Sequence, residues 1–529
     1  MTASACSAME PTSLADWFVR GLHAAPEGLA LRVGTDAWTY SELYGRALAL
    51  GGTVARTTGR SPVGILAARS VECYAGILGA MFAGAPVVPL NPTFPLDRTV
   101  AMASRAGVRA VIADRSGAAV VPALRAALPD LVVIAPDPAV LAVTDGVEAG
   151  DPLPAPVAVS PCDIAYTLFT SGSTGAPKGV PITHANVAHF LTTNQARYGL
   201  TPRDVCSQTF EATFDLVMFD LFMTWGSGAA LVSTPVHVFG SLPEFVADQG
   251  LTVWFSVPSA IALVRRRGGL SPGSMPSLRW SLFCGEALLG ADAEAWQAAA
   301  PNSTVENLYG PTELTIACSA YRWDPRRSPA ECVDGVVPIG RIYPGLDHLL
   351  RNEAGERTGD EGELCVAGPQ TFPGYLDARD DEDRFVEYDG VRWYRTGDLV
   401  RSVRAGLAYL GRVDHQIKIR GYRVELGEIE WHLRRAAGVE EAVVVPVRDA
   451  LTHRLAAWYT GRGDLAGRLR GHLAASVPAF MVPHWIHHTS GLPRSPNGKI
   501  DRRALAELAQ QRADGHASVE QVVQQHGHG

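Results

Sequence analysis

The chain has 529 residues, a formal net charge of −8, 47% hydrophobic residues and 19% charged residues. A chain of this length is expected to fold into two or more domains, and its balance of residues excludes disordered and fibrous proteins. Its negative charge, without a long run of lysine or arginine, argues against nucleic acid as a partner. Any anion that the protein binds must then be held by local groups.

The cysteines and the apolar stretches indicate the compartment. The eight cysteines are scattered, none forms a Cys-x-x-Cys pair, and the N-terminus lacks the basic and then apolar pattern of a secretory signal. The longest apolar stretch, 74–90, is interrupted by glycine and proline and is short for a membrane span, so it predicts a core helix leading into a strand. We therefore expect a cytoplasmic protein without a membrane segment.

The first 140 residues alternate between short apolar segments and helical patterns, which is typical of βαβ units. The apolar segments lie at 63–67, 87–90, 110–113 and 131–134. Before them, Thr39 and Glu42 have the spacing of a capping box, which predicts a helix from about Tyr40 to Thr53. The pattern predicts an α/β fold.

The segment 168–179, LFTSGSTGAPKG, combines glycines, small hydroxyls and one lysine. Glycines let backbone N–H groups approach anionic oxygens, and Lys178 adds a positive charge. An expected strand, 164–169, precedes it, and an expected helix, 182–191, follows it. The spacing differs from a Walker loop, because Lys178 follows Gly175 by three residues. Alone, the segment fits a polyphosphate-binding loop or a plain linker.

The α/β pattern continues to about residue 413 and then changes. Further buried strands are expected at 252–258, 281–284 and 304–308. After them come a strand at 416–419, a helix at 426–435, a strand at 441–447 and a helix at 465–475, the pattern of a small α+β module. The last stretch is rich in Gln, His and Gly. We expect domains at 1–413 and 414–510, and a disordered tail at 511–529.

Eight further motifs follow the loop in a fixed order. They are Phe214-Asp215, NLYGPTE at 307–313, GEL at 362–364, GY at 374–375, YRTGD at 394–398, GRVD at 411–414, KIRGYRVE at 418–425, and LP at 492–493 with NGKID at 497–501. With them, residues 14 to 505 resemble the adenylate-forming superfamily, and within it the stand-alone amino acid adenylation enzymes of nonribosomal peptide synthesis.

The resemblance implies a large N-terminal adenylation domain of packed sheets and helices and a small, mobile α+β C-terminal domain. It also implies two half-reactions. An amino acid carboxylate attacks the α-phosphorus of ATP, and because two anions meet, catalysis is mostly alignment and charge neutralisation. The acyl-adenylate then passes to the phosphopantetheine thiol of a peptidyl or acyl carrier protein. No carrier motif follows residue 505, so we expect the carrier in trans.

The resemblance assigns three residues to catalysis and ten to ATP binding. Glu313 would hold Mg²⁺, Thr312 would contact the α-phosphate, and Lys499 would bridge the carboxylate and that phosphate. Tyr309 would stack on adenine, and Asp398 would accept both ribose hydroxyls. The remaining ATP-binding residues are Thr170, Ser171, Gly172, Ser173, Thr174, Gly175, Lys178 and Arg412. The resemblance also assigns a hinge: Asp414 matches the position at which the small domain rotates to withdraw Lys499.

The resemblance also assigns the lining of the substrate pocket. The residues are Asp215, Leu216, Phe219, Phe255, Leu282, Cys284, Leu308, Ile316, Ala317 and Lys499, the last of which would pair with the substrate carboxylate. Asp215 would pair with a substrate ammonium, which an aryl or fatty acid would not need. The other lining residues carry no charge, so a charged substrate side chain would be buried without a partner. The substrate should be a small neutral amino acid.

This lining resembles that of stand-alone prolyl ligases, so L-proline is the first choice. Cys284-Gly285-Glu286 also resembles the D-alanine carrier ligases. Alanine of either hand or a small β-amino acid therefore stays open. Two other hypotheses are an acyl-CoA ligase, which Asp215 disfavours, and a non-catalytic ATP-binding scaffold, which the joint presence of Lys499, Glu313 and Asp398 disfavours.

Overall fold

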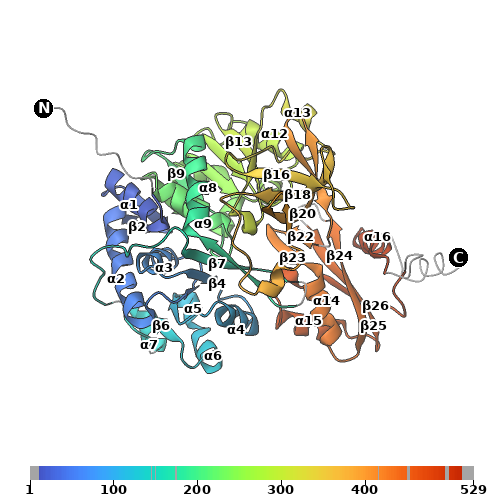
Figure 1. Ribbon diagram of the computed structural model, residues 1–529, viewed down its shortest axis with the longest axis horizontal. Helices are drawn as coiled ribbons and strands as arrows, with labels where there is room; N and C mark the ends of the chain where they lie inside the picture. Colours follow the sequence, from blue (N-terminus) through green and yellow to red (C-terminus); the bar gives the residue numbers. More distant parts are fainter. Residues whose placement is uncertain are drawn as a thin grey trace.

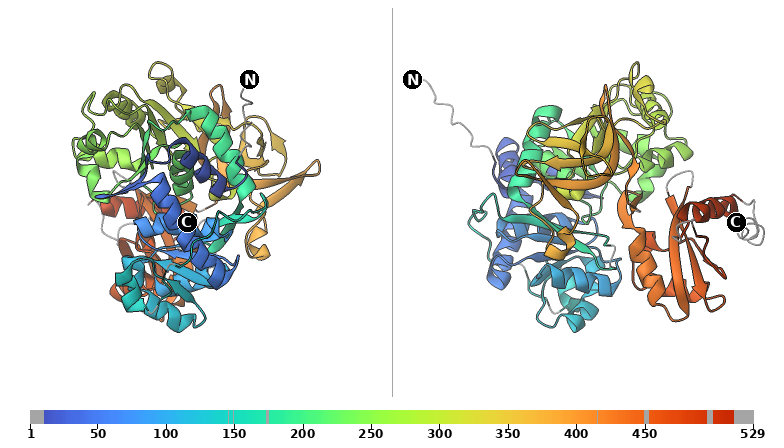
Figure 2. Two further views of the ribbon diagram at one scale, coloured as in Figure 1. Left: turned by 90° about the vertical axis from the view of Figure 1, so that its left-hand side faces the viewer. Right: turned by 45° about the vertical axis from the view of Figure 1, so that its right-hand side comes forward.

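The structure is a computed structural model that describes residues 11–144, 146–148, 150–172, 175–414, 416–448, 453–494 and 500–514. A large N-terminal body contains three sheets, and a smaller C-terminal body beside it contains two (Figures 1 and 2). This confirms the predicted α/β fold with a large N-terminal and a small C-terminal domain. No helix in the described part of the chain has the length and apolar character needed to cross a membrane.

The first sheet has six strands and carries the predicted phosphate loop. Its order is β6 (Val132–Ile134), β5 (Ala110–Ala113), β3 (Val63–Leu66), β4 (Val87–Leu90), β7 (Ile164–Thr170) and β8 (Lys178–Thr183). The first five are parallel, as the βαβ pattern predicts, and β8 runs antiparallel to β7. The loop therefore connects two paired strands at the edge of this sheet.

The second sheet has nine strands and carries most of the predicted substrate pocket. Its order is β15 (Arg341–Ile342), β14 (Ser319–Arg322), β13 (Thr304–Tyr309), β12 (Trp280–Phe283), β11 (Val253–Ser256), β9 (Val205–Gln208), β10 (Ala230–Ser233), β1 (Leu29–Val33) and β2 (Asp36–Thr39). The strands β11, β12 and β13 are parallel neighbours, so their carboxyl ends meet at one edge. They match the three strands expected from the sequence.

The third sheet of the large body is antiparallel, and the sequence analysis did not anticipate it. Its strands are β17 (Arg357–Thr358), β16 (Asp347–Arg351), β18 (Glu361–Ala367), β20 (Val391–Val403) and β19 (Phe385–Tyr388), with β21 (Gly406–Arg412) paired to β20. Asp398 on β20 is directly opposite Arg412 on β21. This register brings two predicted ATP-binding residues together.

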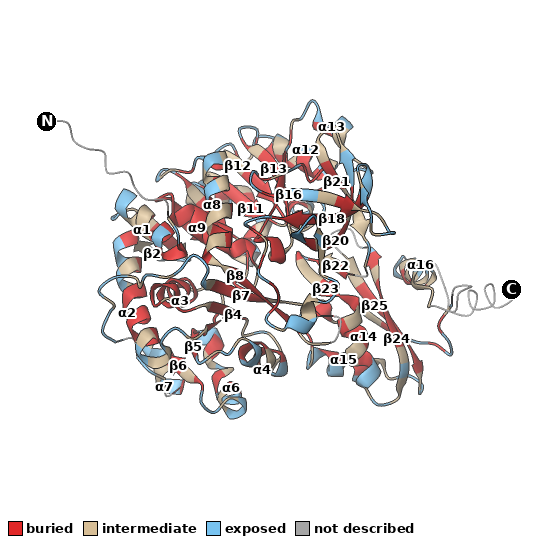
Figure 3. Cartoon of the chain, in the orientation of Figure 1, coloured by how far each residue is buried: buried red, intermediate tan, exposed pale blue. Residues whose placement is uncertain are grey.

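Helices fill the space between the sheets and cover their outer faces. The helices of the large body are α1 (Leu14–Ala24), α2 (Tyr40–Thr58), α3 (Val71–Phe82), α4 (Leu96–Arg105), α5 (Arg115–Ala118), α6 (Val121–Ala127), α7 (Pro138–Thr144), α8 (His184–Tyr198), α9 (Leu216–Trp225), α10 (Leu242–Gln249), α11 (Ser259–Arg266), α12 (Gly290–Ala299) and α13 (Ser328–Glu331). Every residue of α9 is buried, and Figure 3 shows α3 and the neighbouring strands as buried too. A helix that is apolar on all sides belongs in the core.

The small body is a three-stranded sheet covered on both faces, preceded by a hairpin. The hairpin consists of β22 (Gln416–Ile419) and β23 (Tyr422–Glu425). The rest comprises α14 (Leu426–Arg435), β24 (Val439–Arg448), β25 (His453–Gly461), α15 (Ala466–Ala474), β26 (Trp485–His488) and α16 (Arg502–Ala513). Ala442 and Val444 pack under α14 and α15, whereas Val443 and Val445 pack under α16.

Three predicted boundaries were wrong. Ile182 belongs to β8, not to a helix, and α8 begins at His184 because Thr183 and Asn186 form a capping box. The capping box at Thr39 is confirmed, but α2 continues to Thr58. The predicted tail at 511 begins inside α16, whose Leu505 and Ala509 pack against the sheet; residues 515–529 lie outside the described residues.

Candidate active site

A cavity of about 100 Å³ lies where strands of the large body end and the hairpin of the small body begins. Predicted residues from both proposed subsites line it: Thr170, Ser171, Asp215, Leu216, Cys284, Thr312, Ile316, Asp398 and Arg412. These residues come from all three sheets of the large body and from the loops after their strands. The structure thus places the predicted amino acid and ATP residues around one space.

Asp398 is the centre of the predicted ribose contact. The Tyr309 hydroxyl donates to one Asp398 oxygen at 2.5 Å, and Arg412 Nη1 donates to the other at 2.5 Å. Burial raises the pKa of Tyr309, and the nearby Asp398 carboxylate raises it further, so the hydroxyl remains a donor. Tyr309, Asp398 and Arg412 also border a neighbouring cleft of about 660 Å³. A nucleoside entering this cleft would compete for the oxygens of Asp398.

The predicted phosphate loop is contacted by the small body. The Ser171 hydroxyl donates to the Arg423 carbonyl at 2.8 Å and accepts from the Glu425 amide at 3.0 Å. Gly175 has a φ of +81°, and a Cβ there would approach the Trp431 ring of α14 to 2.4 Å, so this position requires glycine. Ser173 and Thr174 lie outside the described residues.

Two more predicted phosphate ligands have protein partners. Lys178 Nζ lies 3.2 Å from Asp380 Oδ1, and the Gly172 amide donates to Glu428 Oε2 at 3.3 Å. Together with the contacts of Ser171, these bonds occupy groups that the resemblance assigns to ATP phosphates. In the described arrangement the small body therefore covers Ser171 and Gly172, whereas Lys178 is paired within the large body.

Glu313, the predicted Mg²⁺ ligand, is fully buried and doubly paired. Arg423 Nη1 lies 2.9 Å and 3.0 Å from its two oxygens, and the Tyr375 hydroxyl donates at 2.6 Å. Burial alone would raise the pKa of Glu313, but Arg423 and Tyr375 outweigh it and lower that pKa. Among the described residues, no group of three or more metal-binding side chains gathers at this or any other place.

A single carboxylate still fits one mode of Mg²⁺ binding. Mg²⁺ keeps several waters and is commonly held by one or two carboxylates together with substrate phosphates. Glu313 can supply that carboxylate once Arg423 withdraws, because the guanidinium occupies both of its oxygens in the described arrangement. The site therefore fits a metal that arrives with a nucleotide.

Asp215 provides a buried carboxylate on the amino acid side of the cavity. It precedes the first turn of α9, and burial raises its pKa to about 6, although Thr312 and Lys418 act in the opposite direction. Burial likewise raises the pKa of the neighbouring Cys284 thiol to about 12, so the thiol stays protonated and serves as a small apolar group. An ammonium group placed here would be the natural partner of Asp215.

The remaining predicted pocket residues lie in two layers, one that lines the cavities and one buried behind it. Leu216, Cys284 and Ile316 line the cavity directly, and Leu308 borders the larger cleft. Phe219, Phe255, Leu282 and Ala317 are buried behind them, with the rings of Phe219 and Phe255 4.9 Å apart. Ile316 has a φ of +75°, a strained conformation for a β-branched residue, which commonly marks a functional site.

Several site residues were not predicted. Lys418 borders both the cavity and the cleft, Arg423 pairs with Glu313, and the Gly421 amide donates to Glu286 Oε1 at 2.8 Å. Lys418 and Arg423 are within the motif KIRGYRVE, so the sequence carried a signal for them. Arg98, which also lines the cavity, had no such signal, because its partner Glu428 is 330 positions away.

Lys499 lies outside the described residues, but both ends of its segment are described. Leu492 and Ile500 pack with Leu505 of α16 on the outer face of the small sheet. The opposite face carries α14, which contacts the phosphate loop. The described arrangement presents the hairpin to the site.

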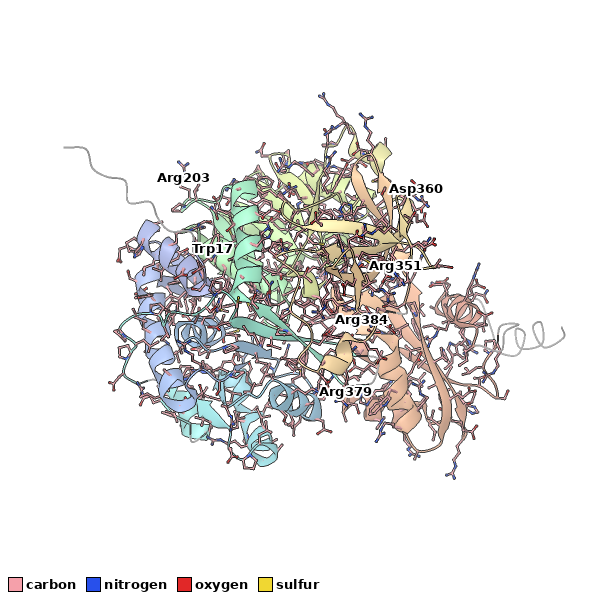
Figure 4. The ribbon with its side chains drawn as sticks, in the orientation of Figure 1. Trp17, Arg203, Arg351, Asp360, Arg379 and Arg384 are labelled. Carbon is pink, nitrogen blue, oxygen red and sulfur yellow. The ribbon has the colours of Figure 1, made fainter. Side chains whose placement is uncertain are left out.

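Asp414 stands between the two bodies and is held by several contacts. It accepts from Arg412 Nε at 2.7 Å, from Arg412 Nη2 at 2.9 Å and from the Gln416 amide at 3.2 Å. Arg384, labelled in Figure 4, lies 4.0 Å away. These contacts join β21 to β22 in the described arrangement, which suits the hinge predicted for this position.

We expect Asp414→Pro to block thiolation while sparing adenylation. The substitution removes the contacts of the carboxylate with Arg412 and Gln416 and restricts φ to about −65°, so the arrangement with the hairpin at the site becomes inaccessible. Pyrophosphate exchange and loading of a carrier thiol, measured on the same preparation, test this expectation. Equal loss of both half-reactions would argue against a hinge.

The comparisons with known proteins agree with this geometry. The family model of the AMP-binding enzyme matches residues 19–376, and that of the AMP-binding enzyme C-terminal domain matches 428–499. An L-proline--[L-prolyl-carrier protein] ligase of Streptomyces coelicolor is 33% identical over 89% of this chain and 92% of its own length. The chain spans less than half the length of seven other curated relatives, which are peptide synthases and synthetases.

Two crystal structures show the same fold. That of IdnL7 is 44% identical, with a TM-score of 0.73 over 96% of this chain and 100% of that one. That of the Vibrio cholerae adenylation domain AlmE, in complex with glycyl-adenosine-5'-phosphate, is 29% identical, with a TM-score of 0.85 over 96% of this chain and 99% of that one. The chain therefore belongs to the AMP-binding enzyme family, as the motifs predicted.

Proposed function

We propose that the protein activates a small neutral amino acid with ATP and transfers it to the phosphopantetheine thiol of a separate carrier protein. The observation that carries the proposal is the buried carboxylate of Asp215 on the wall of a cavity that Thr312, Asp398 and Arg412 also line. A carboxylate suits the substrate ammonium, and the other three suit the nucleotide. The reacting carboxylate and the α-phosphate would then meet between them.

L-Proline is the first candidate substrate. The cavity is small, and Leu216, Cys284 and Ile316 form an uncharged part of its wall beside Asp215, which favours a substrate side chain without charge. The proline ligase relative supports this choice, and the relative that binds glycyl-adenylate supports a small substrate in general. Alanine remains the alternative, because a pocket discriminates by only about 1–3 kcal/mol per methylene.

ATP would enter with Mg²⁺ after the hairpin withdraws. Arg423 would then release Glu313, whose carboxylate would hold the metal, and the metal would neutralise charge on the phosphates. Thr312 would position the α-phosphate, Asp398 would hold the ribose, and Lys499 would stabilise charge that develops as the new bond forms. When the hairpin returns, a carrier thiol would attack the acyl-adenylate.

Pyrophosphate exchange over the twenty amino acids, D-alanine and small β-amino acids tests the proposal. We expect exchange with L-proline, or with alanine in the alternative, followed by loading of a holo-carrier protein. Thiolation of coenzyme A in place of a carrier would instead favour an acyl-CoA ligase. If no substrate supports exchange, the proposal is refuted, and the non-catalytic ATP-binding scaffold is the hypothesis that remains.

The pH dependence of substrate use gives a second test. Burial raises the pKa of Asp215 to about 6, so the carboxylate loses its charge, and its attraction for an ammonium, as the pH falls through that value. We expect kcat/KM for the amino acid to be flat above about pH 7 and to fall about tenfold per pH unit well below 6. Exchange assays from pH 5 to 8 measure it, with Asp215→Asn as the control that should lose the Asp215-dependent fall.

A further inference from the structure

The ion pair between Arg98 of α4 and Glu428 of α14 joins the large body to the small one beside the phosphate loop. Arg98 Nη1 lies 2.5 Å from Glu428 Oε1, and the two side chains are 7% and 0% exposed. Figure 1 shows α4 and α14 as neighbours across the boundary between the bodies. Neither residue has a part in the chemistry described so far.

Arg98 is also part of the cavity wall. It lines the cavity together with Thr170 and Ser171, at the end where the phosphate loop begins. Its Nε is buried and has no hydrogen-bond partner within the described residues. A guanidinium can donate five hydrogen bonds in a planar fork that suits phosphate oxygens. This side chain therefore has unused donor capacity facing a space assigned to a nucleotide.

Glu428 makes contacts that a phosphate oxygen could replace. One oxygen accepts from Arg98, and the other accepts from the backbone amide of Gly172 in the phosphate loop. A guanidinium and a glycine amide that converge on one anion form a typical phosphate-binding pair. When α14 moves away, Arg98 loses its counter-charge, and an anion that takes the place of Glu428 would restore the pairing.

We propose that Arg98 binds the pyrophosphate end of the nucleotide when α14 is withdrawn, and that the Glu428 carboxylate takes this place when α14 docks. The inference rests on the proposed function and adds a residue outside the phosphate loop to its pyrophosphate site. Docking of α14 and occupancy by pyrophosphate then exclude each other, because both anions need Arg98 and the Gly172 amide. Pyrophosphate must leave before the hairpin can reach the site.

Direct binding of inorganic pyrophosphate to the full chain tests the proposal. Isothermal titration in the presence of Mg²⁺ compares the wild type with Arg98→Ala, Arg98→Gln, Arg98→Lys and Glu428→Gln, with thermal melting as the check of folding. We expect Arg98→Ala and Arg98→Gln to weaken pyrophosphate binding about tenfold or more, as the loss of a charge-assisted contact predicts. Arg98→Lys should restore part of the affinity, and Glu428→Gln should bind pyrophosphate at least as tightly as the wild type.

Two controls separate this role from a structural one. AMP lacks the pyrophosphate end, so its affinity should be unchanged in the Arg98 variants. Arg115→Ala removes an exposed arginine that pairs with Asp137 at 2.7 Å, away from the phosphate loop, and it should leave pyrophosphate binding unchanged. Wild-type affinity in Arg98→Gln, or an equal loss in Glu428→Gln, would overturn the proposal.

The exchange and binding measurements together distinguish a failure of this inference from a failure of the proposed function. If the wild type catalyses amino acid-dependent exchange but Arg98→Gln binds pyrophosphate normally, only the role of Arg98 fails. If the wild type neither exchanges nor binds pyrophosphate, the proposed function fails as well.

Discussion

Replacement of Lys499 by alanine will lower the rate of amino acid-dependent pyrophosphate exchange by at least about 10²-fold, which corresponds to about 2.7 kcal/mol of transition-state stabilisation. The reason is electrostatic: a carboxylate attacks a phosphorus that bears anionic oxygens, and a lysine between them neutralises charge that develops only as the bond forms. Glu313 and Asp398 are carboxylates and cannot take this role, and Arg412, a cation at the cavity, is paired with Asp398. The measurement is kcat for exchange at saturating ATP and amino acid.

The arrangement of the small body makes this prediction specific. The described arrangement presents the hairpin to the site, and we expect Lys499 to act in a second arrangement, reached by rotation of the small body. Thiolation of a preformed acyl-adenylate should therefore be spared in Lys499→Ala. Arg503→Ala removes a cation four positions along the chain that pairs with Glu507 on the surface of α16, and it should retain normal exchange. Near-normal exchange by Lys499→Ala would contradict the assigned role.

Local sequence patterns were sufficient to predict some elements of the fold. The capping box at Thr39 and the buried strand at Val63–Leu66 depend on neighbouring residues, so the sequence predicts them directly. The helix predicted at Ile182 failed because a short apolar run fits a strand equally well, and only pairing with β7 decides between them. The antiparallel sheet of β16 to β21 was missed because the pairing of its strands is not decided by a local pattern.

The same distinction applies to the site: local motifs predict some of its residues and not others. The motifs identified Asp215, Thr312 and Asp398, and the structure brings them to one cavity from the start of α9, from the turn after β13 and from within β20. The partners that the small body supplies could not be predicted. The pairs Arg98–Glu428 and Glu286–Gly421 depend on which face that body presents, and this choice is made by docking between distant segments and not by local propensity.

Replacement of Asp215 by alanine will raise KM for the amino acid by roughly 10²- to 10³-fold, because an unpaired ammonium in a buried site costs roughly 3–5 kcal/mol. The carboxylate is 8% exposed, and water cannot easily replace it. Asp215→Asn keeps the shape and removes the charge, so it should show most of the loss. Asp220→Asn is the matched control on the same helix: burial raises the pKa of Asp220 well above its ordinary value, so the neutral amide resembles the native acid.

A substrate without the amino group separates charge pairing from general damage to the pocket. Cyclopentanecarboxylate has the ring of proline without its ammonium, so the wild type should discriminate strongly against it, whereas Asp215→Ala should treat it and proline nearly alike. The coupling between the substrate change and the residue change isolates the ion pair from the cost of an altered cavity. An unchanged KM for the amino acid in Asp215→Ala, or equal discrimination in both proteins, would show that the ammonium binds elsewhere, and the case for an amino acid substrate would lose its main support.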